Sequence, residues 1–129
     1  LGQALLVPTR LYVAPVLAAI RAGGVHAAAH ITGGGITENL PRVLPDGLGA
    51  LVDLDSFPLP AVFDWLAEAG GIAEAEMLKT FNSGIGMILA VAADRADALQ
   101  ALLEEEGETV HRLGHVVPGE GVRYSGSLR

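Results

Sequence analysis

Apolar residues recur at helical spacing in several stretches of the chain. Val16, Leu17 and Ile20 show this spacing. The pattern starts near Pro15, which suits a first helical turn, and two glycines end it, so a helix is predicted over Val13–Ala22. Similar apolar spacing, or acidic residues in a first turn, predicts the other helices. They are expected over Thr37–Val43, Pro60–Ala69, Ala73–Phe81 and Asp94–Glu106.

Short apolar runs bounded by glycine or proline alternate with these helices, as is typical of buried strands. Two further strands, Thr109–Val117 and Val122–Ser125, flank a Pro-Gly-Glu-Gly sequence that suits a tight turn, so we expect them to form a hairpin. Leu1–Val13 is expected to be irregular or extended, because Pro8 prevents an early helix. The other strands are predicted over Val25–Thr32, Leu48–Leu54 and Met87–Val91.

The alternation of strands and helices predicts an α/β or α+β fold in which helices pack on a mixed sheet. A length of 129 residues with no repeat or linker fits one domain, residues 1–129. Half of the residues are apolar and 18% are charged, which is typical of a folded globular protein. Aromatic residues make up only 5%, so the interior should be built from aliphatic side chains.

Charge and cysteine content exclude several classes of function. The net charge is −7, which would repel a nucleic-acid backbone, although backbone amides can still hold a small anionic ligand. The absence of cysteine excludes disulfides and thiolate metal sites and favours a cytoplasmic location. No signal peptide is expected, and the longest apolar stretch, Gly84–Ala93, is too short to cross a membrane. The first residue is Leu rather than Met, which suggests a fragment.

The most informative segment is a glycine loop between a predicted strand and a predicted helix. Gly33-Gly34-Gly35 lacks the side chains that would keep a ligand away from the backbone, so its N–H groups can cradle an anion. Thr32, Asn39 and Arg42 can add hydrogen bonds, and Arg42 offers a forked donor to a phosphate. The pattern matches neither a Walker A loop nor a dinucleotide fingerprint, and a plain tight turn is an equally good interpretation.

A second loop of small residues precedes the strand predicted at Met87. Asn82, Ser83 and Gly84 place an amide and a hydroxyl at the mouth of that strand. Two such loops meeting at one sheet edge would form a pocket for a polar small molecule. The alternative is structural: Asn82 and Ser83 cap a turn, and Gly84 supplies a positive φ.

The histidines do not predict a metal site. His26 and His30 are four residues apart, but on a strand their Cα atoms would lie roughly 13 Å apart, too far to share one ion. His30 alone precedes the glycines and suits a general acid or base, although a structural histidine is the simpler interpretation.

Other polar residues are weaker candidates. Thr9 and Arg10 lie in the irregular first segment, from which a side chain can reach a ligand, but most isolated surface arginines bind nothing. Asp53 and Asp55 would share one face of a strand and could hold Mg²⁺, but a solvated strand end is the more common arrangement.

Three motifs together resemble a known family. The run from His30 to Pro45, His-Ile-Thr-Gly-Gly-Gly-Ile-Thr-Glu-Asn-Leu-Pro-Arg-Val-Leu-Pro, resembles the signature of the phosphoribosylformylglycinamidine cyclo-ligases, also called aminoimidazole ribonucleotide synthetases. Pro8–Tyr12 and Glu76–Met87 are similar to two further motifs of that family, in the same order. The family often has cysteine where this chain has Ser83, so a thiol cannot be essential here.

The resemblance implies a fold and a reaction. It implies the C-terminal domain of a two-domain enzyme, an α/β/α sandwich with a mixed sheet, partly ferredoxin-like. The enzyme uses ATP and Mg²⁺ to cyclise formylglycinamidine ribonucleotide to aminoimidazole ribonucleotide, ADP and phosphate. In this family the N-terminal domain, absent from this chain, carries most nucleotide and metal contacts and the homodimer contact. The chain alone is therefore expected to be inactive.

The resemblance also implies roles for residues. His30 and Asn82 would lie near the reacting centre. The substrate would be bound by Thr9, Arg10, Thr32, Gly33, Gly34, Gly35, Asn39, Arg42, Ser83 and Gly84. The alternatives are a related enzyme, such as formylglycinamidine synthase, selenophosphate synthetase, thiamine-phosphate kinase or a hydrogenase maturation protein, or a non-catalytic module that binds a phosphorylated ligand.

Overall fold

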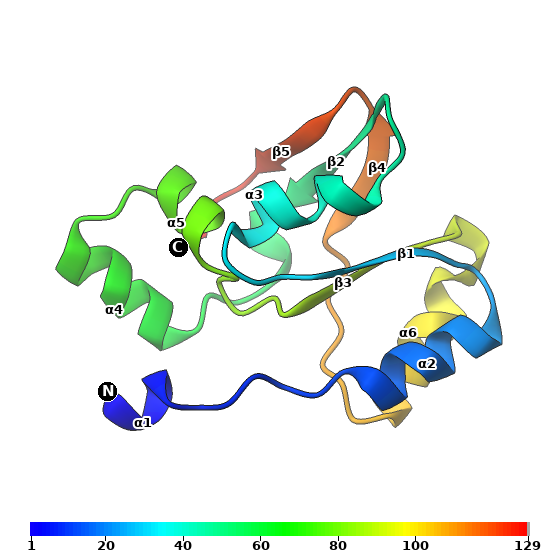
Figure 1. Ribbon diagram of the computed structural model, residues 1–129, viewed down its shortest axis with the longest axis horizontal. Helices are drawn as coiled ribbons and strands as arrows, with labels where there is room; N and C mark the ends of the chain where they lie inside the picture. The colour runs from blue at the N-terminus through cyan, green and yellow to red at the C-terminus, as the bar shows by residue number, and fades with distance from the viewer. Residues whose placement is uncertain (129) are drawn as a thin grey trace.

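The computed structural model describes residues 1–128, and its helices and strands alternate along the chain (Figure 1). The α-helices are α1 (Gly2–Leu5), α2 (Val13–Ala22), α3 (Gly35–Asn39), α4 (Ala61–Gly70), α5 (Glu74–Thr80) and α6 (Ala96–Glu105). The strands are β1 (Val25–His30), β2 (Leu48–Asp53), β3 (Met87–Val91), β4 (Gly114–Pro118) and β5 (Gly121–Ser125). Short 3₁₀ turns are η1 (Pro41–Val43), η2 (Leu54–Ser56) and η3 (Ala93–Arg95).

Most predicted elements are present within a few residues of their expected bounds. Two differ in kind. The first segment contains the single turn α1, which was not expected, although it ends before Pro8. The helix predicted over Thr37–Val43 is divided into α3 and η1, because Pro41 has no N–H to donate to the carbonyl that an unbroken α-helix would offer it.

The strands form two sheets, and the mixed α/β class is confirmed. β1 and β3 make an antiparallel pair in which His30 lies opposite Met87. In the second sheet β2 is central, antiparallel to β4 and parallel to β5, so this sheet is mixed as predicted. Figure 1 shows α2 and α6 together on one side of the β1–β3 pair, with α3 and the three-stranded sheet on the other.

The predicted C-terminal hairpin is wrong. β4 and β5 are adjacent in sequence, but each pairs with β2, which lies between them. Their connection passes close over β2 at Gly49, where a Cβ would overlap the carbonyl oxygens of Gly119 and Gly121. The turn residues do reverse the chain, but the side chain missing at Gly49 lets the connection cross β2 instead of closing a hairpin.

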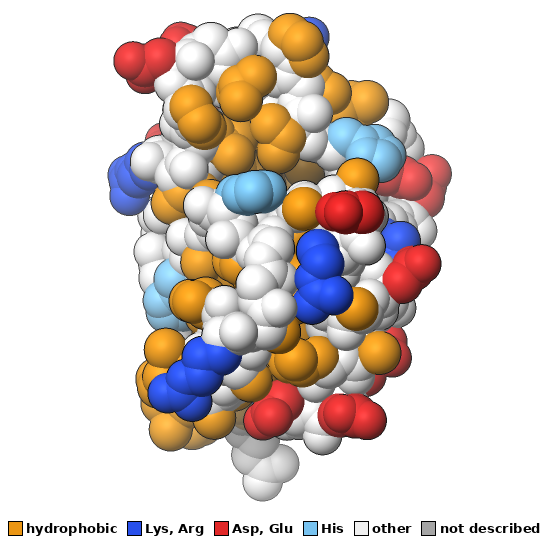
Figure 2. Space-filling view, turned by 90° about the vertical axis from the view of Figure 1, so that its right-hand side faces the viewer, with side chains coloured by type: hydrophobic (Ala, Val, Ile, Leu, Met, Phe, Trp, Pro, Cys, Tyr) orange, Lys and Arg blue, Asp and Glu red, His pale blue; other side chains and the backbone are white. Residues whose placement is uncertain are grey.

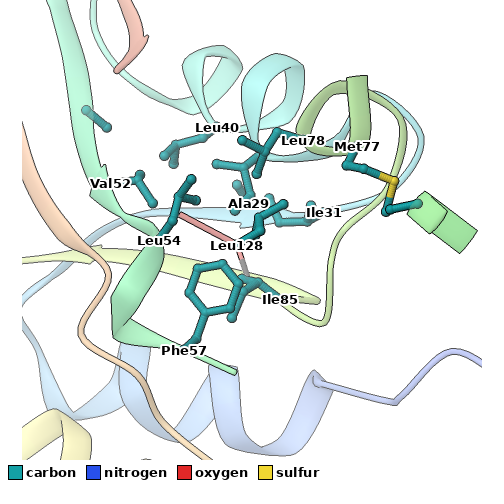
Figure 3. Close-up of a cluster of buried hydrophobic side chains, with 13 residues drawn as sticks. Ala29, Ile31, Leu40, Val52, Leu54, Phe57, Met77, Leu78, Ile85 and Leu128 are labelled. Atoms are coloured by element: carbon teal, nitrogen blue, oxygen red, sulfur yellow. The ribbon is translucent and has the colours of Figure 1, made fainter. Parts of the chain in front are cut away.

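The core lies between the β1–β3 pair and the three-stranded sheet (Figure 3). It is mainly aliphatic, as predicted, with Phe57 as its buried aromatic ring. Leu128, near the C-terminus, joins it and is held by a hydrogen bond from its N–H to Glu74 Oε2 at 2.9 Å. Its buried members are Ala29, Ile31, Ile36, Leu40, Ala50, Val52, Leu54, Phe57, Ala67, Met77, Leu78, Ile85 and Leu128.

Helix α2 buries a different face from the one its pattern indicates. Its buried residues are Pro15 and Ala19, where it packs beside α6. Leu17 and Ile20 remain 41% and 50% exposed. The helix was predicted correctly from its spacing, but only a part of its apolar stripe has a partner within residues 1–128.

Candidate functional site

The two glycine loops lie at the same end of the β1–β3 pair, as expected. The antiparallel register places the end of β1 beside the start of β3. Beyond the paired strands, the N–H of Ile31 donates to the carbonyl of Gly86 at 2.9 Å. The loop after β1 and the loop before β3 are thereby held next to one another.

The first loop, residues 32–35, has a fixed shape. Gly34 and Gly35 adopt positive φ values of 103° and 61°, and the N–H of Gly35 donates to the carbonyl of Thr32 at 3.0 Å. A Cβ at Gly35 would overlap the carbonyl oxygen of Leu78 and lie 2.7 Å from that of Phe81. Gly35 is therefore the point at which the first loop packs directly on the segment leading into the second.

Gly33 differs from its neighbours because it faces open space. A Cβ there would meet nothing within 4 Å, and its φ is not positive. Thr32 and Gly33 are exposed, and the N–H groups of Gly33 and Gly34 have no hydrogen-bond partner among residues 1–128. Unpaired backbone N–H groups of this kind suit an anionic oxygen.

Asn39 and Arg42 belong to the same unit as the loop. The Nδ2 group of Asn39 donates to the carbonyls of Thr32 and Gly33, both at 3.2 Å, and of Gly35 at 2.9 Å. Its Oδ1 accepts a hydrogen bond from Nη1 of Arg42 at 3.3 Å. The structure thus brings together the residues predicted in this segment, and Arg42 adds an exposed cation that is linked to the loop through Asn39.

One acidic side chain lies against this unit. The ideal Cβ position at Gly34 is 2.7 Å from Oε2 of Glu38, so the Glu38 side chain covers Gly34. An anion that approaches the loop would be repelled by this carboxylate unless the side chain turns away. Glu38 was not among the residues predicted for the site.

The second loop is a tight turn. The carbonyl of Asn82 accepts from the N–H of Ile85 at 3.0 Å, and its Oδ1 accepts from the N–H of Gly84 at 2.9 Å. Ser83 and Gly84 have φ values of 52° and 94°. The structural interpretation of Asn82 and Gly84 therefore describes the geometry of the turn, and the Nδ2 group of Asn82 has no hydrogen-bond partner among residues 1–128.

Ser83 is the unusual residue of this turn. It is completely buried, and its hydroxyl has no hydrogen-bond partner among the described residues. Among residues 1–128, it is also the one residue other than glycine that has a positive φ. Burying a hydroxyl without a hydrogen-bond partner costs folding free energy, and the protein carries this cost at Ser83.

His30 is exposed at the end of β1, and Tyr12 packs against it. The two rings meet edge-on with centroids 5.9 Å apart. The Tyr12 phenol also fills the space beside Gly86, and burial, followed by the nearby Glu108 carboxylate, raises the pKa of Tyr12, while Arg10 lowers it. Sequence reasoning missed Tyr12, although it ends a recognised motif and is one of only 2 tyrosines.

The structure gives Arg10 a different neighbourhood from the loops. Its Nε donates to both carboxylate oxygens of Glu108, at 2.9 and 3.0 Å, and its Nη2 donates to the carbonyl of Gly107 at 3.1 Å. These partners follow the end of α6. The predicted role of Thr9 and Arg10 in substrate binding stays a prediction.

The remaining candidates have structural partners. Oδ1 of Asp53 accepts from the N–H of Asp55, and Oδ1 of Asp55 accepts from the N–H of Ser127, so both carboxylates organise the chain end. His26 and His30 lie on a strand, as expected. Within residues 1–128, no three His, Asp or Glu side chains gather in a way that would hold a metal ion. No helix in the same range is long and apolar enough to span a membrane.

Surface charge and hollows complete the description. Figure 2 shows one face on which basic side chains are separated by apolar and acidic ones. A hollow of about 400 Å³ lies between α4, α5 and the C-terminal residues, lined in part by Leu59, Glu74 and Leu128. A second, of about 590 Å³, lies along α2 and is lined mainly by apolar residues that include Leu11 and Leu17. Neither hollow is lined by the glycine loops.

Comparison with known proteins gives one family and a set of similar structures. The family described as "AIR synthase related protein, C-terminal domain" matches residues 1–126. Thiamine-monophosphate kinase from Stenotrophomonas maltophilia K279a is 25% identical, with a TM-score of 0.62 over 85% of this chain and 34% of the kinase. HypE from E. coli is 26% identical, with a TM-score of 0.69 over 94% of this chain and 38% of HypE.

A second structure of E. coli HypE, described as a hydrogenase maturation protein, gives 26% identity and a TM-score of 0.69. That match covers 97% of this chain and 40% of HypE. The chain therefore spans between 34% and 40% of the length of these structures.

Proposed function

This chain belongs to the family of AIR synthase related proteins, in which it matches the C-terminal domain, and from that premise we propose that it works in an ATP-dependent cyclo-ligase. The reaction would close the imidazole ring of formylglycinamidine ribonucleotide and release aminoimidazole ribonucleotide, ADP and phosphate. The chain would be one domain, residues 1–129, of a cytoplasmic homodimeric enzyme whose other domain carries most contacts to ATP and Mg²⁺.

One observation carries the proposal. The segment from His30 to Arg42 is the part of the sequence most similar to the cyclo-ligases, and in the structure it is one hydrogen-bonded unit. Gly35 packs this unit against the Leu78 and Phe81 carbonyls, within the other motif that resembles the same family. Two motifs far apart in the sequence thus pack against each other, which supports a shared substrate site.

In this proposal the chain's own residues bind and orient the substrate. The free N–H groups of Gly33 and Gly34, with Arg42, would hold the substrate phosphate, and Thr32 and Gly84 would line the same edge, whereas the predicted ligand Ser83 is buried. His30, exposed beside Tyr12, would hold or move a proton near the reacting amidine. Asn82 would donate from Nδ2, which the turn leaves unused.

ATP would supply the phosphoryl group that turns the formamide oxygen into a good leaving group. An amidine nitrogen of the same substrate would then attack the formamide carbon, and the bond from this carbon to the phosphorylated oxygen would break with release of phosphate. Because both reacting groups belong to one flexible molecule, holding its ends close supplies much of the rate.

A second candidate is a related phosphoryl-transfer enzyme. Its support is the likeness to a thiamine-monophosphate kinase at 25% identity. A maturation protein like HypE is supported in the same way. All three candidates share the family, so only a reaction assay separates them.

The test is the formation of aminoimidazole ribonucleotide by the complete protein that carries these residues, with Gly34→Val and Asn39→Ala variants. Gly2→Ala, at a glycine with no neighbour within 4 Å, and Gln100→Ala, at a surface amide, are the matched controls. We expect activity in the protein and both controls and its collapse in the folded loop variants. ATP-dependent phosphorylation of thiamine monophosphate without ring closure would replace the proposal with the kinase.

The 129-residue chain alone should show no ATP-dependent ring closure. Detectable turnover by the purified chain would contradict the proposed division of labour between the two domains. Light scattering on the complete protein tests the homodimer separately, and a monomeric mass at every concentration would exclude it.

A further inference from the structure

Asn39 has almost no capacity left to bind a ligand. It is buried, and its two Nδ2 protons are shared among three backbone carbonyls, those of Thr32, Gly33 and Gly35. Its Oδ1 accepts from Arg42. A primary amide offers two donors and one acceptor oxygen, so these contacts use both sides of the group.

Arg42 would be expected to pair with another residue. Glu38 lies at the end of α3 and Arg42 in η1, four residues further along the chain, so a carboxylate of opposite charge is close to Arg42 in the sequence. No such pair exists in the structure: within residues 1–128 the ion pairs are Arg10–Glu108 and Arg112–Asp97. Arg42 is instead held by Asn39, and its Nε and Nη2 have no partner among the described residues.

We propose that Asn39 is a positioning residue, which holds the Thr32–Gly35 loop in shape and keeps the Arg42 guanidinium away from Glu38. The proposal rests on the proposed function, because it takes this unit to be the phosphate site. The ligand phosphate contacts Arg42 and the N–H groups of Gly33 and Gly34, but not Asn39. Without Asn39, Arg42 pairs with Glu38, and its positive charge is no longer available to bind the ligand phosphate.

The direct test follows the side-chain signals of Asn39 and Arg42 by ¹⁵N NMR, with inorganic phosphate and ribose 5-phosphate as probes. We expect slowly exchanging Asn39 Nδ2 protons before any ligand is added, and little change in them at saturation. The Gly33, Gly34 and Arg42 signals should shift with both probes if the phosphate group is what is recognised. Large shifts of Asn39 Nδ2 would show that it is a ligand and would overturn the proposal.

Substitutions separate positioning from a merely structural role. Asn39→Ala should weaken phosphate binding about tenfold, the usual size of a lost charge-assisted hydrogen bond. Asn39→Asp keeps the acceptor for Arg42 but loses the donors to the loop, so the Arg42 Nη1 signal should stay restrained while the loop amides shift. Free averaging of Arg42 in Asn39→Asp would contradict the proposal.

A double-mutant cycle between Asn39 and Glu38 is a second test of the proposal. Glu38→Gln should strengthen phosphate binding more in the Asn39→Ala background than in the unsubstituted protein, because only there does Glu38 capture Arg42. Equal gains in the two backgrounds would overturn the proposal. Arg21→Gln, at an exposed arginine at the end of α2, controls for the general loss of a positive charge. Arg42→Gln should abolish the effects of Asn39→Ala and Glu38→Gln on phosphate binding.

The outcomes distinguish this inference from the proposed function. Phosphate binding with the expected coupling, but no ring closure by the complete protein, would leave Asn39 in its positioning role and reject the cyclo-ligase. Ring closure with additive effects of Asn39→Ala and Glu38→Gln would retain the cyclo-ligase and reject the positioning role. Absence of any phosphate-dependent shift at Gly33, Gly34 and Arg42 would reject the phosphate site and this inference with it.

Discussion

The phenol of Tyr12 fills the space that a side chain at Gly86 would need. A Cβ at Gly86 would overlap the Tyr12 hydroxyl oxygen and lie 2.9 Å from Cζ of the ring. The segment before α2 is thereby fixed against the start of β3, beside His30. The glycine is required by its neighbour, since its own φ is not in the positive region.

Gly86→Ala should therefore destabilise the protein by about 2 kcal/mol, the usual cost of overpacking, as measured by urea unfolding. In a Tyr12→Ala background the same substitution should cost less than about 0.5 kcal/mol, because the clash has been removed. A cost that is equal in both backgrounds would show that the ring does not set the requirement for glycine.

Gly35→Ala and Gly33→Ala should differ sharply. Gly35 combines a φ of 61° with an overlap between its Cβ position and the Leu78 carbonyl oxygen, so we expect a loss of about 3 kcal/mol or more. Gly33 has open space and no positive φ, so alanine there should change stability by less than about 1 kcal/mol. Denaturant unfolding of the pair measures the difference, and similar losses at both sites would contradict this account of the loop.

Ser83→Ala should raise stability. Its hydroxyl is buried without a partner among residues 1–128, and removing it ends a desolvation cost of about 1 kcal/mol. The alanine keeps the Cβ and the backbone strain at φ 52°, so the measured change isolates the hydroxyl. A loss of stability in chemical unfolding would mean that the hydroxyl is hydrogen-bonded in solution.

The raised pKa of Tyr124 predicts that the stability of the protein depends on pH in the alkaline range. Burial raises its pKa above the ordinary value of 10.0, and the hydrogen bond with Thr37 at 2.8 Å partly lowers it. Because the folded state keeps the proton longer than the unfolded state, its contribution to stability is complete below pH 10 and is lost as the pH rises through the folded pKa.

Unfolding free energies between pH 8 and pH 12 should therefore fall less steeply in Tyr124→Phe than in the unsubstituted protein. Tyr12 has a pKa raised in the same direction, so Tyr12→Phe is the control and should remove only a part of the slope. An unchanged slope in the double variant Tyr12→Phe/Tyr124→Phe would exclude the tyrosines as its cause.

Local patterns predicted the elements well. The helix at Val13–Ala22 and the strand at Met87–Val91 have the bounds that spacing and composition indicated. The residues that determine this helix and this strand lie within each element or in the glycines and loops that border it. The meeting of the two glycine loops, by contrast, depends on the antiparallel pairing of β1 with β3, which passes over β2 in the sequence and which local patterns did not indicate.

Long-range relationships were not predictable in the same way. The turn chemistry after Pro118 indicated a hairpin, but Gly49, far earlier in the chain, is what lets the connection cross β2. At the site, Asn39 was interpreted as a substrate ligand because its type fits that role. Only the structure shows that its amide is used by the carbonyls of its own loop.

The position of β2 between β4 and β5 has a consequence for synthesis on the ribosome. Leu48 pairs with Pro118, and Gly49 pairs with Gly121, so the central strand emerges long before either neighbour. During that interval both of its hydrogen-bonding edges lack their native partners, and pairing of distant strands is slow. We expect nascent chains arrested before residue 114 to need chaperone protection against aggregation, and protection to become unnecessary once β5 has emerged.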